Sequence, residues 1–243
     1  MKTLQFILIL LLSFILNSCV KDTETKVDLS KILELKLFPN NKDTVKIPAD
    51  GTTKIKLTAV LGDLSDDKKN VIFYASSGDL LTYDGGTGSN NVTQEAINKE
   101  ASVQLRTSTI PDDGVFLTAK VDNYFVKRPV VFTNSHPDTV FIKPDAYFTT
   151  SDKIEINVEL LKLKGFVSSK VPVYFKIIDS GTSGLQVTID PYKFSDNGSK
   201  INPSVLRSTL QKINENVGKV TVEVSTIKSN GGEFKKTVQV EFK

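Results

Sequence analysis

The sequence predicts an all-β protein made of two tandem β-sandwiches that follow a cleaved N-terminal segment. Two observations predict this class. Short runs in which apolar and polar residues alternate are separated by Gly, Asp and Asn turns, and the same order of runs returns about 100 residues further along the chain.

The first copy begins with a clear alternation. Leu33, Leu35 and Leu37 fall on one face of an extended chain, and Glu34 and Lys36 fall on the other, as expected for a half-buried strand. Further strands of this copy are predicted at residues 54–59, 71–75, 101–105, 115–121 and 130–132.

The second copy repeats this order. The predicted equivalent segments are residues 55–59 and 154–158, 71–73 and 173–175, 117–121 and 220–224, and 130–132 and 240–242. We therefore predict one domain over residues 32–133 and a second over residues 134–243, joined near residues 134–138.

The second copy departs from the first at one place. Pro203, with Asn202 or Ser204 available as a cap, precedes apolar residues at roughly helical spacing. These apolar residues are Val205, Leu206, Leu210, Ile213 and Val217. The spacing predicts a short helix that covers one end of the second sandwich.

The N-terminal segment has the plan of a signal peptide. Lys2 precedes an apolar run from Phe6 to Leu16 that is shorter than the roughly 20 residues a bilayer-spanning helix needs, and Ser18 stands before Cys19. The alternatives are an ordinary secretory peptide with an accidental cysteine, or an uncleaved anchor. The segment predicts cleavage after residue 18.

Leu16-Asn17-Ser18-Cys19 resembles the lipobox of bacterial lipoprotein precursors. The resemblance implies that Cys19 is the lipidation site, that it carries acyl chains such as palmitate, and that it anchors the chain to a membrane. Each buried methylene contributes about 0.8 kcal/mol, so two or three acyl chains hold the protein firmly. Residues 19–31 then form the lipidated N-terminus and a flexible tether.

The residues after Cys19 bear on location. Val20 in place of Asp is compatible with export to the outer membrane, and residues 21–24 resemble the surface-export signal of Bacteroidota lipoproteins, although Thr23 interrupts its acidic pair. We expect a lipid-anchored outer-membrane protein exposed at the cell surface. The plainer interpretation of residues 21–24 is a polar tether.

The first copy resembles the bacterial immunoglobulin-like domains of the invasin and intimin type. The resemblance rests on residues 49–53 with the alternation of Ile55, Leu57 and Ala59, and on residues 71–73, 77–80, 101–105 and 114–121. It departs at Lys99-Glu100, where the family usually has glycine. The resemblance implies two tandem immunoglobulin-like sandwiches that act as spacers or adhesive modules without a catalytic centre.

Charge and composition exclude several function classes. The chain has 31 Lys and Arg against 28 Asp and Glu, and loss of Lys2 with residues 1–18 lowers the net charge from +3 to +2. This balance leaves no electrostatic footprint for nucleic acid. With one Cys and one His, the chain has neither a disulfide framework nor a zinc site of several such ligands.

Candidate catalytic groups are few, so we predict no enzyme, cofactor or metal site. His136 falls in the expected exposed linker, and Glu155 and Glu159 share a solvated strand face. The Asp63, Asp66 and Asp67 cluster and the Asp112-Asp113 pair fit turns better than calcium loops. The Gly-rich residues 84–91, which lack the Lys-Ser/Thr ending of a P-loop, and residues 179–184 are predicted to be loops at corresponding ends of the two copies.

Two functions are favoured over a third, a hydrolase, which would need two carboxylates that meet in a cleft about 5–10 Å apart. One is a non-enzymatic outer-membrane lipoprotein that serves as a surface adhesion, spacer or envelope-complex module. The other is a glycan-binding accessory lipoprotein of a nutrient-uptake system, for which the candidate aromatic residues are Tyr83, Tyr124, Phe125, Tyr192 and Phe194. Thr44 and Thr139 lie in Asp-Thr-aliphatic triplets that resemble Bacteroidota O-glycosylation sites.

Overall fold

The computed structural model describes residues 28–66, 68–82, 87–181, 184–195 and 204–243. The signal segment and Cys19 lie outside these residues, as do Tyr83 and the start of the expected helix. Of the expected tether, the structure describes residues 28–31. Leu29–Lys31 form a 3-10 turn (η1), and the Asp28 carboxylate accepts a hydrogen bond from the backbone N–H of Ser30.

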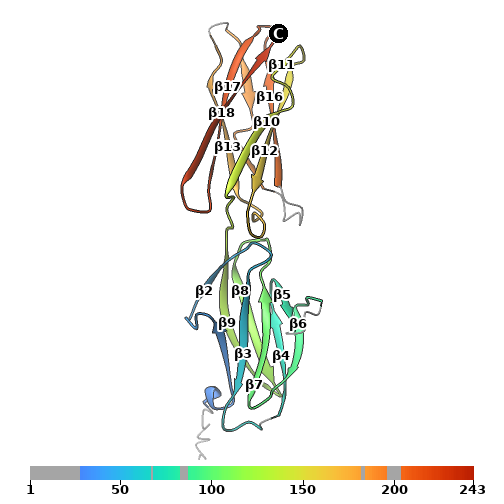
Figure 1. Ribbon diagram of the computed structural model, residues 1–243, viewed down its shortest axis with the longest axis vertical. Coiled ribbons are helices and arrows are strands. Elements are labelled where there is room, and N and C mark those ends of the chain that lie inside the picture. Colours follow the sequence, from blue (N-terminus) through green and yellow to red (C-terminus); the bar gives the residue numbers. More distant parts are fainter. Residues whose placement is uncertain (1–27, 67, 83–86, 182–183, 196–203) are drawn as a thin grey trace, which may run out of the picture.

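Nine strands form the first sandwich in two facing sheets (Figure 1). The four-stranded sheet has the order β1-β3-β7-β5, and the five-stranded sheet has the order β2-β9-β8-β4-β6. The bounds are β1 (Leu33–Phe38), β2 (Val45–Pro48), β3 (Lys54–Leu61), β4 (Asn70–Ala75), β5 (Asp79–Leu81), β6 (Asn91–Glu95), β7 (Glu100–Arg106), β8 (Asp112–Val121) and β9 (Tyr124–Thr133).

Nine further strands form the second sandwich, which lies end to end with the first (Figure 1). Its sheets have the orders β10-β12-β16-β14 and β11-β18-β17-β13-β15. The bounds are β10 (Thr139–Pro144), β11 (Phe148–Thr149), β12 (Lys153–Leu161), β13 (Pro172–Asp179), β14 (Val187–Ile189), β15 (Tyr192–Phe194), β16 (Ser204–Lys212), β17 (Gly218–Ile227) and β18 (Glu233–Phe242).

The two strand orders are the same when nine is added to each strand number of the first sandwich. The correspondence extends to pairing details. The short strands β2 and β11 both pair in parallel with the last strand of their sandwich. Ile55 lies opposite Leu105 in the first sandwich, and Ile154 lies opposite Leu210 in the second. The predicted tandem repeat and all-β fold are therefore confirmed.

The predicted helix at residues 203–217 is wrong, because its described part begins with the long strand β16, which takes the place that β7 has in the first sandwich. Leu206, Ser208 and Leu210 alternate inward and are all buried, whereas Ile213 and Val217 are exposed. Ser208 interrupts the apolar alternation in the sequence. Its buried hydroxyl donates to the carbonyl of Asp190 at 3.3 Å, so a polar residue is accommodated at a core position.

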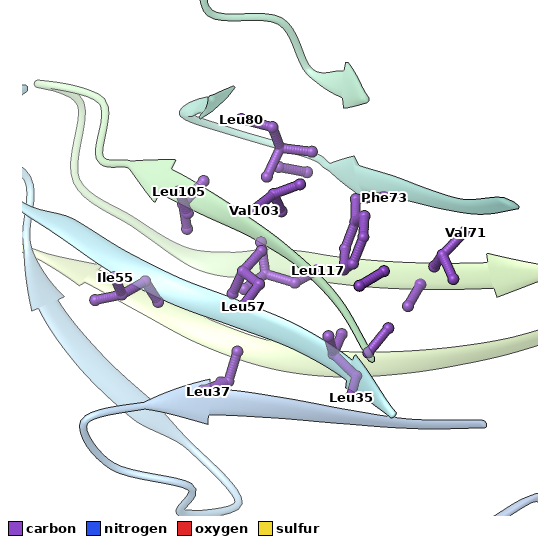
Figure 2. Close-up of a cluster of buried hydrophobic side chains, with 14 of the residues drawn as sticks. Leu35, Leu37, Ile55, Leu57, Val71, Phe73, Leu80, Val103, Leu105 and Leu117 are labelled. Atoms are coloured by element: carbon purple, nitrogen blue, oxygen red, sulfur yellow. The ribbon is translucent and has the colours of Figure 1, made fainter. Parts of the chain in front are cut away.

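Each sandwich has a core of its own. In the first, side chains of β1, β3 and β7, among them Leu35, Leu57 and Val103, point toward Phe73 and Leu117 of the facing sheet (Figure 2). Phe73 and Leu117 are fully buried. A fully buried side chain of this size contributes about 1.5–3 kcal/mol, which lets each sandwich stand without a disulfide.

Candidate functional site

The two sandwiches meet through hydrogen bonds between their loops, and we call this contact the joint. The loop between β12 and β13 of the second sandwich approaches residues 49–53 and 107–111 of the first. The backbone N–H of Phe166 donates to the carbonyl of Asp50 at 2.9 Å, and that of Ser169 donates to the carbonyl of Thr109 at 2.9 Å. The hydroxyl of Ser168 donates to the carbonyl of Ala49 at 2.7 Å.

A chain of serines continues the joint into the second sandwich. The Ser168 hydroxyl accepts from the backbone N–H of Ser135 at 2.6 Å, and the Ser168 carbonyl accepts from the Ser195 hydroxyl at 2.6 Å. The Ser195 hydroxyl also accepts from the backbone N–H of Val171 at 2.9 Å. All three serines are buried, so the bonds are shielded from water. An unmade hydrogen bond here costs more than in a solvated linker.

Two glycines let the sandwiches approach closely. Gly165 has a positive φ of 76°, and a Cβ there would lie 2.6 Å from the hydroxyl of Thr52 and 2.9 Å from Asp50 Cβ. Gly51 has φ of 70°, and a Cβ would lie 2.8 Å from Thr109 and 3.2 Å from the Phe166 ring. Larger residues at these positions would be both strained and obstructed.

Asp50 organises the first-sandwich side of the joint. Its carboxylate accepts from the backbone N–H groups of Thr52 at 2.8 Å and Thr53 at 2.6 Å, and from the Thr53 hydroxyl at 2.7 Å. The Thr107 hydroxyl donates at 3.3 Å. Burial alone would raise the pKa of Asp50, but the hydrogen bonds from Thr53 and Thr52 outweigh it and lower the pKa below its usual range.

His136 lies beside the joint and is half-buried, which corrects the exposed position expected for it. Its Nδ1 is buried and has no hydrogen-bond partner in the described part of the chain. Burial, and then the nearby positive charge of Lys162, lowers the pKa of this imidazole. Lys162 Nζ donates to the His136 carbonyl at 3.0 Å, so the segment expected as a simple linker is packed into the joint.

A cavity of about 560 Å³ lies against the joint. Its walls are a cation pair, an anion, hydroxyl groups and one aromatic ring, and all but the ring come from the first sandwich. The lining residues are Gly51, Thr52, Lys54, Gly78, Asp79, Arg106, Thr107, Ser108, Thr109 and Phe166. The sequence alone does not predict this site, because its residues come together only through three neighbouring strands and a loop of the other sandwich.

The carboxylates that were weighed as candidate sites have structural explanations. Asp66 forms an ion pair with Lys69, and Asp67 lies outside the described residues. Asp112 and Asp113 begin strand β8, not the predicted turn, and the Asp112 carboxylate accepts from the backbone N–H of Gly114 where the strand register shifts. Glu155 accepts from the Thr209 hydroxyl, and Glu159 is exposed on the same strand. Within the described residues, no group of three or more His, Cys, Asp or Glu is placed to hold a metal ion.

The predicted correspondence between the two candidate loops is wrong, whereas the candidate aromatic residues that the structure describes are exposed. Residues 179–184 connect β13 to β14 and so correspond to the β4–β5 turn, not to the Gly-rich segment between β5 and β6 as predicted. The aromatic candidates that the structure describes are all exposed, at 41% for Tyr124, 58% for Phe125, 54% for Tyr192 and 53% for Phe194. They are free to meet a partner.

Each sandwich has two facing sheets of four and five strands, in which most strand pairs are antiparallel. This arrangement, repeated in tandem, defines an immunoglobulin-like architecture. Over 88% of its length, the chain is similar to a structure of the adhesin InvE of Yersinia pseudotuberculosis, with a TM-score of 0.56 and 16% identity. Over 86% of its length, it is similar to invasin, titled a bacterial integrin-binding protein, with a TM-score of 0.54 and 18% identity. The matches cover 59% and 39% of those chains.

No protein-family model matches the chain, and no curated protein sequence matches it. The likeness to these adhesin structures therefore establishes the invasin-type immunoglobulin-like fold. In the part of the chain that the structure describes, no helix has the length and hydropathy to cross a bilayer.

Proposed function

We propose that the chain is a non-enzymatic outer-membrane lipoprotein whose two sandwiches form a stiff surface module for adhesion, spacing or assembly of an envelope complex. The joint is the observation that carries the proposal. Two backbone donors and one buried hydroxyl of the second sandwich bond directly to carbonyls of the first. A flexible linker would leave these groups to water, whereas the joint holds the sandwiches in line.

The fold comparison and the N-terminal sequence support the rest of the proposal. InvE is an adhesin, and invasin is a bacterial integrin-binding protein. An end-to-end pair of sandwiches of the same fold suits a similar task of holding a contact surface away from a membrane (Figure 1). Cys19, after its apolar run, provides the proposed lipid anchor at the end that precedes the first sandwich.

Protease shaving of intact cells tests the location. The cells are treated with protease and probed with an antibody against the second sandwich, and a periplasmic protein serves as leakage control. We expect loss of the second sandwich while the control stays intact. Protection until the outer membrane is broken would contradict a surface role and would direct the search for partners to the periplasm.

The anchor has a separate test. Cells fed a labelled palmitate should label the wild-type chain and not the Cys19→Ser variant. Equal labelling of the two chains, or none of either, would contradict lipidation at Cys19.

A second function, glycan binding in a nutrient-uptake system, is favoured by one observation. Tyr174, Tyr192 and Phe194 form an exposed aromatic group on the outer face of the second sandwich, at 51%, 54% and 53% exposure. Tyr174 lies opposite Tyr192 in the sheet, and the rings of Tyr192 and Phe194 lie edge to face with centroids 5.6 Å apart. Sugars stack on such rings.

Binding to immobilised polysaccharides tests this second function. The Tyr174→Ala and Tyr192→Ala double variant should lose binding. Phe116→Ala serves as the control, because Phe116 is an exposed aromatic residue of the first sandwich outside the candidate set. Absence of binding by the wild-type chain across a panel of polysaccharides would remove this alternative and leave the stiff module.

A further inference from the structure

The cavity at the joint carries an unbalanced row of charges across three strands. Lys54 of β3 lies directly opposite Arg106 of β7, and Arg106 lies opposite Asp79 of β5. Like charges directly opposite one another destabilise a sheet. The row therefore has two positive charges against one negative charge, on the outer face of the four-stranded sheet.

Only half of this positive charge is compensated. Arg106 Nη2 forms an ion pair with Asp79 Oδ2. Among the described residues, Lys54 has no hydrogen-bond or ion-pair partner, and its side chain is exposed at the cavity wall. A guanidinium has five N–H donors, so Arg106 retains donors beyond those that Asp79 accepts. An anion is the complement of this wall.

The remaining walls suit a sugar ring. The half-buried Phe166 lines the cavity from the second sandwich, and the polar residues Thr52, Ser108 and Thr109 line it from the first. The Thr52 hydroxyl donates to Asp50 and the Ser108 hydroxyl donates to the Ile110 carbonyl, so both would act toward a ligand as acceptors. Gly78 also lines the cavity, and a Cβ added to Gly78 would lie 2.6 Å from the Arg106 carbonyl oxygen. The volume of about 560 Å³ lies within the range of roughly 300–1,000 Å³ that is typical of small-ligand sites.

We propose that this cavity binds an acidic sugar residue, such as a uronic or sialic acid unit of a glycan. Its carboxylate lies between Lys54 and the free donors of Arg106, because charge-assisted bonds from a guanidinium to a carboxylate are among the strongest that proteins form. The apolar face of the sugar packs on Phe166, and ring hydroxyls bond to the Thr and Ser side chains and to Asp79. The inference goes beyond the proposed surface role and does not depend on location.

Isothermal titration calorimetry on the purified full chain in detergent tests this binding. The probes are sodium glucuronate, galacturonate and N-acetylneuraminate, with neutral glucose and galactose and with sodium acetate as controls. We expect saturable binding of at least one acidic sugar, weaker binding of acetate, and no saturable binding of the neutral sugars. Because the wall is built from two cations, Lys54→Gln should weaken that binding roughly tenfold.

Matched variants separate the site from general charge. Lys46→Gln makes the same change in net charge at an exposed position of β2 in the other sheet, and it should leave the affinity within about twofold of the wild type. Phe166→Leu keeps an apolar side chain while removing the ring, and it should weaken sugar binding more than acetate binding. Circular dichroism and the melting temperature of each variant establish that it is folded.

Three outcomes would overturn the inference. The first is that none of the acidic sugars binds up to millimolar concentration. The second is that Lys46→Gln weakens binding as much as Lys54→Gln does. The third is that the neutral sugars or acetate bind as tightly as the acidic sugars. These results would leave the protease-shaving and palmitate experiments unaffected, so a failure of the cavity and a failure of the proposed surface role are distinguishable.

Discussion

The hydroxyl of Ser168 in the second sandwich lies 2.7 Å from the carbonyl oxygen of Ala49 in the first. The same hydroxyl accepts from the backbone N–H of Ser135 at 2.6 Å, and Ser168 is fully buried. One side chain thus satisfies a carbonyl of one sandwich and an amide of the segment that connects the two. Ser168 therefore supplies the one side-chain hydrogen bond that the described residues make across the joint, beside the backbone bonds of Phe166 and Ser169.

Ser168→Ala should loosen the joint. The variant leaves the Ala49 carbonyl and the Ser135 amide buried without this partner, which costs about 1–3 kcal/mol for each unsatisfied group. We expect a broader distribution of distances between spin labels on Thr93 and Thr237, which are exposed on different sandwiches. Cys19 is the only cysteine and is replaced by Ser for labelling.

Ser102→Ala is the control for this measurement. Ser102 bonds to Thr58 at 2.9 Å within the first sandwich, away from the joint, so its loss should lower stability without widening the distance distribution. A distribution for Ser168→Ala as narrow as that of the wild type would show that the hydroxyl does not hold the sandwiches together.

Gly165→Ala should open the same joint by a steric route. The new Cβ would lie 2.6 Å from the Thr52 hydroxyl and 2.9 Å from Asp50, and the positive φ adds about 1 kcal/mol of backbone strain. Gly231→Ala is the matched control, because Gly231 has φ of 78° but nothing within 4 Å of a Cβ. Limited proteolysis at residues 133–138 should be accelerated in the first variant alone. Equal acceleration in both would attribute the effect to backbone strain.

The sequence predicted the repeat because both sandwiches keep a period of two on their inward faces. Leu33, Leu35 and Leu37 are all buried, as their alternation indicated. At β16 the pattern failed, because Ser208 occupies a core position between Leu206 and Leu210 and the apolar residues that remained fitted a helical spacing. Register in a sheet decides burial, and a single sequence does not show which strands are neighbours.

The joint and its cavity are not predictable from the sequence for the same reason, because a single sequence does not show which strands are neighbours. Lys54, Asp79 and Arg106 are far apart in sequence and meet only because β7 lies between β3 and β5. Phe166 comes from the other sandwich. The sequence signal at the joint is Asp50-Gly51-Thr52-Thr53, which by itself indicates only the resemblance to invasin-type domains. In the structure, the Asp50 carboxylate accepts hydrogen bonds that order this loop. The Asp50 carbonyl accepts a hydrogen bond from the backbone N–H of Phe166 in the second sandwich.

Leu210→Ala tests the assignment of β16 as a core strand. Leu210 is fully buried and lies opposite Ile154, so its truncation should cost about 2–5 kcal/mol of stability. Leu105→Ala is the equivalent change in the first sandwich. Hydrogen exchange should show each variant weakening protection chiefly in its own sandwich, because the two cores are separate clusters. A cost for Leu210→Ala below 0.5 kcal/mol would contradict its core position.

His136 should make the stability of the chain depend on pH. Burial and then Lys162 lower its pKa in the folded protein below the value of about 6.5 in the unfolded chain. Below the unfolded pKa the unfolded chain therefore binds a proton that the folded chain does not, and the free energy of unfolding falls as the pH drops toward the folded pKa. Above about pH 6.5 the imidazole is neutral in both the folded and the unfolded chain, so the free energy of unfolding carries no penalty from His136.

His136→Gln isolates this effect, because His136 is the only histidine and Gln does not titrate. Urea unfolding of the two chains, followed by far-UV circular dichroism between pH 8 and pH 5, should show a smaller loss of stability for the variant. Lys162→Gln should also reduce the loss, since Lys162 contributes to the lowered pKa, although less than burial does. Identical pH profiles for the wild type and His136→Gln would mean that the imidazole titrates normally. The buried Nδ1 at the joint would then be accessible to water.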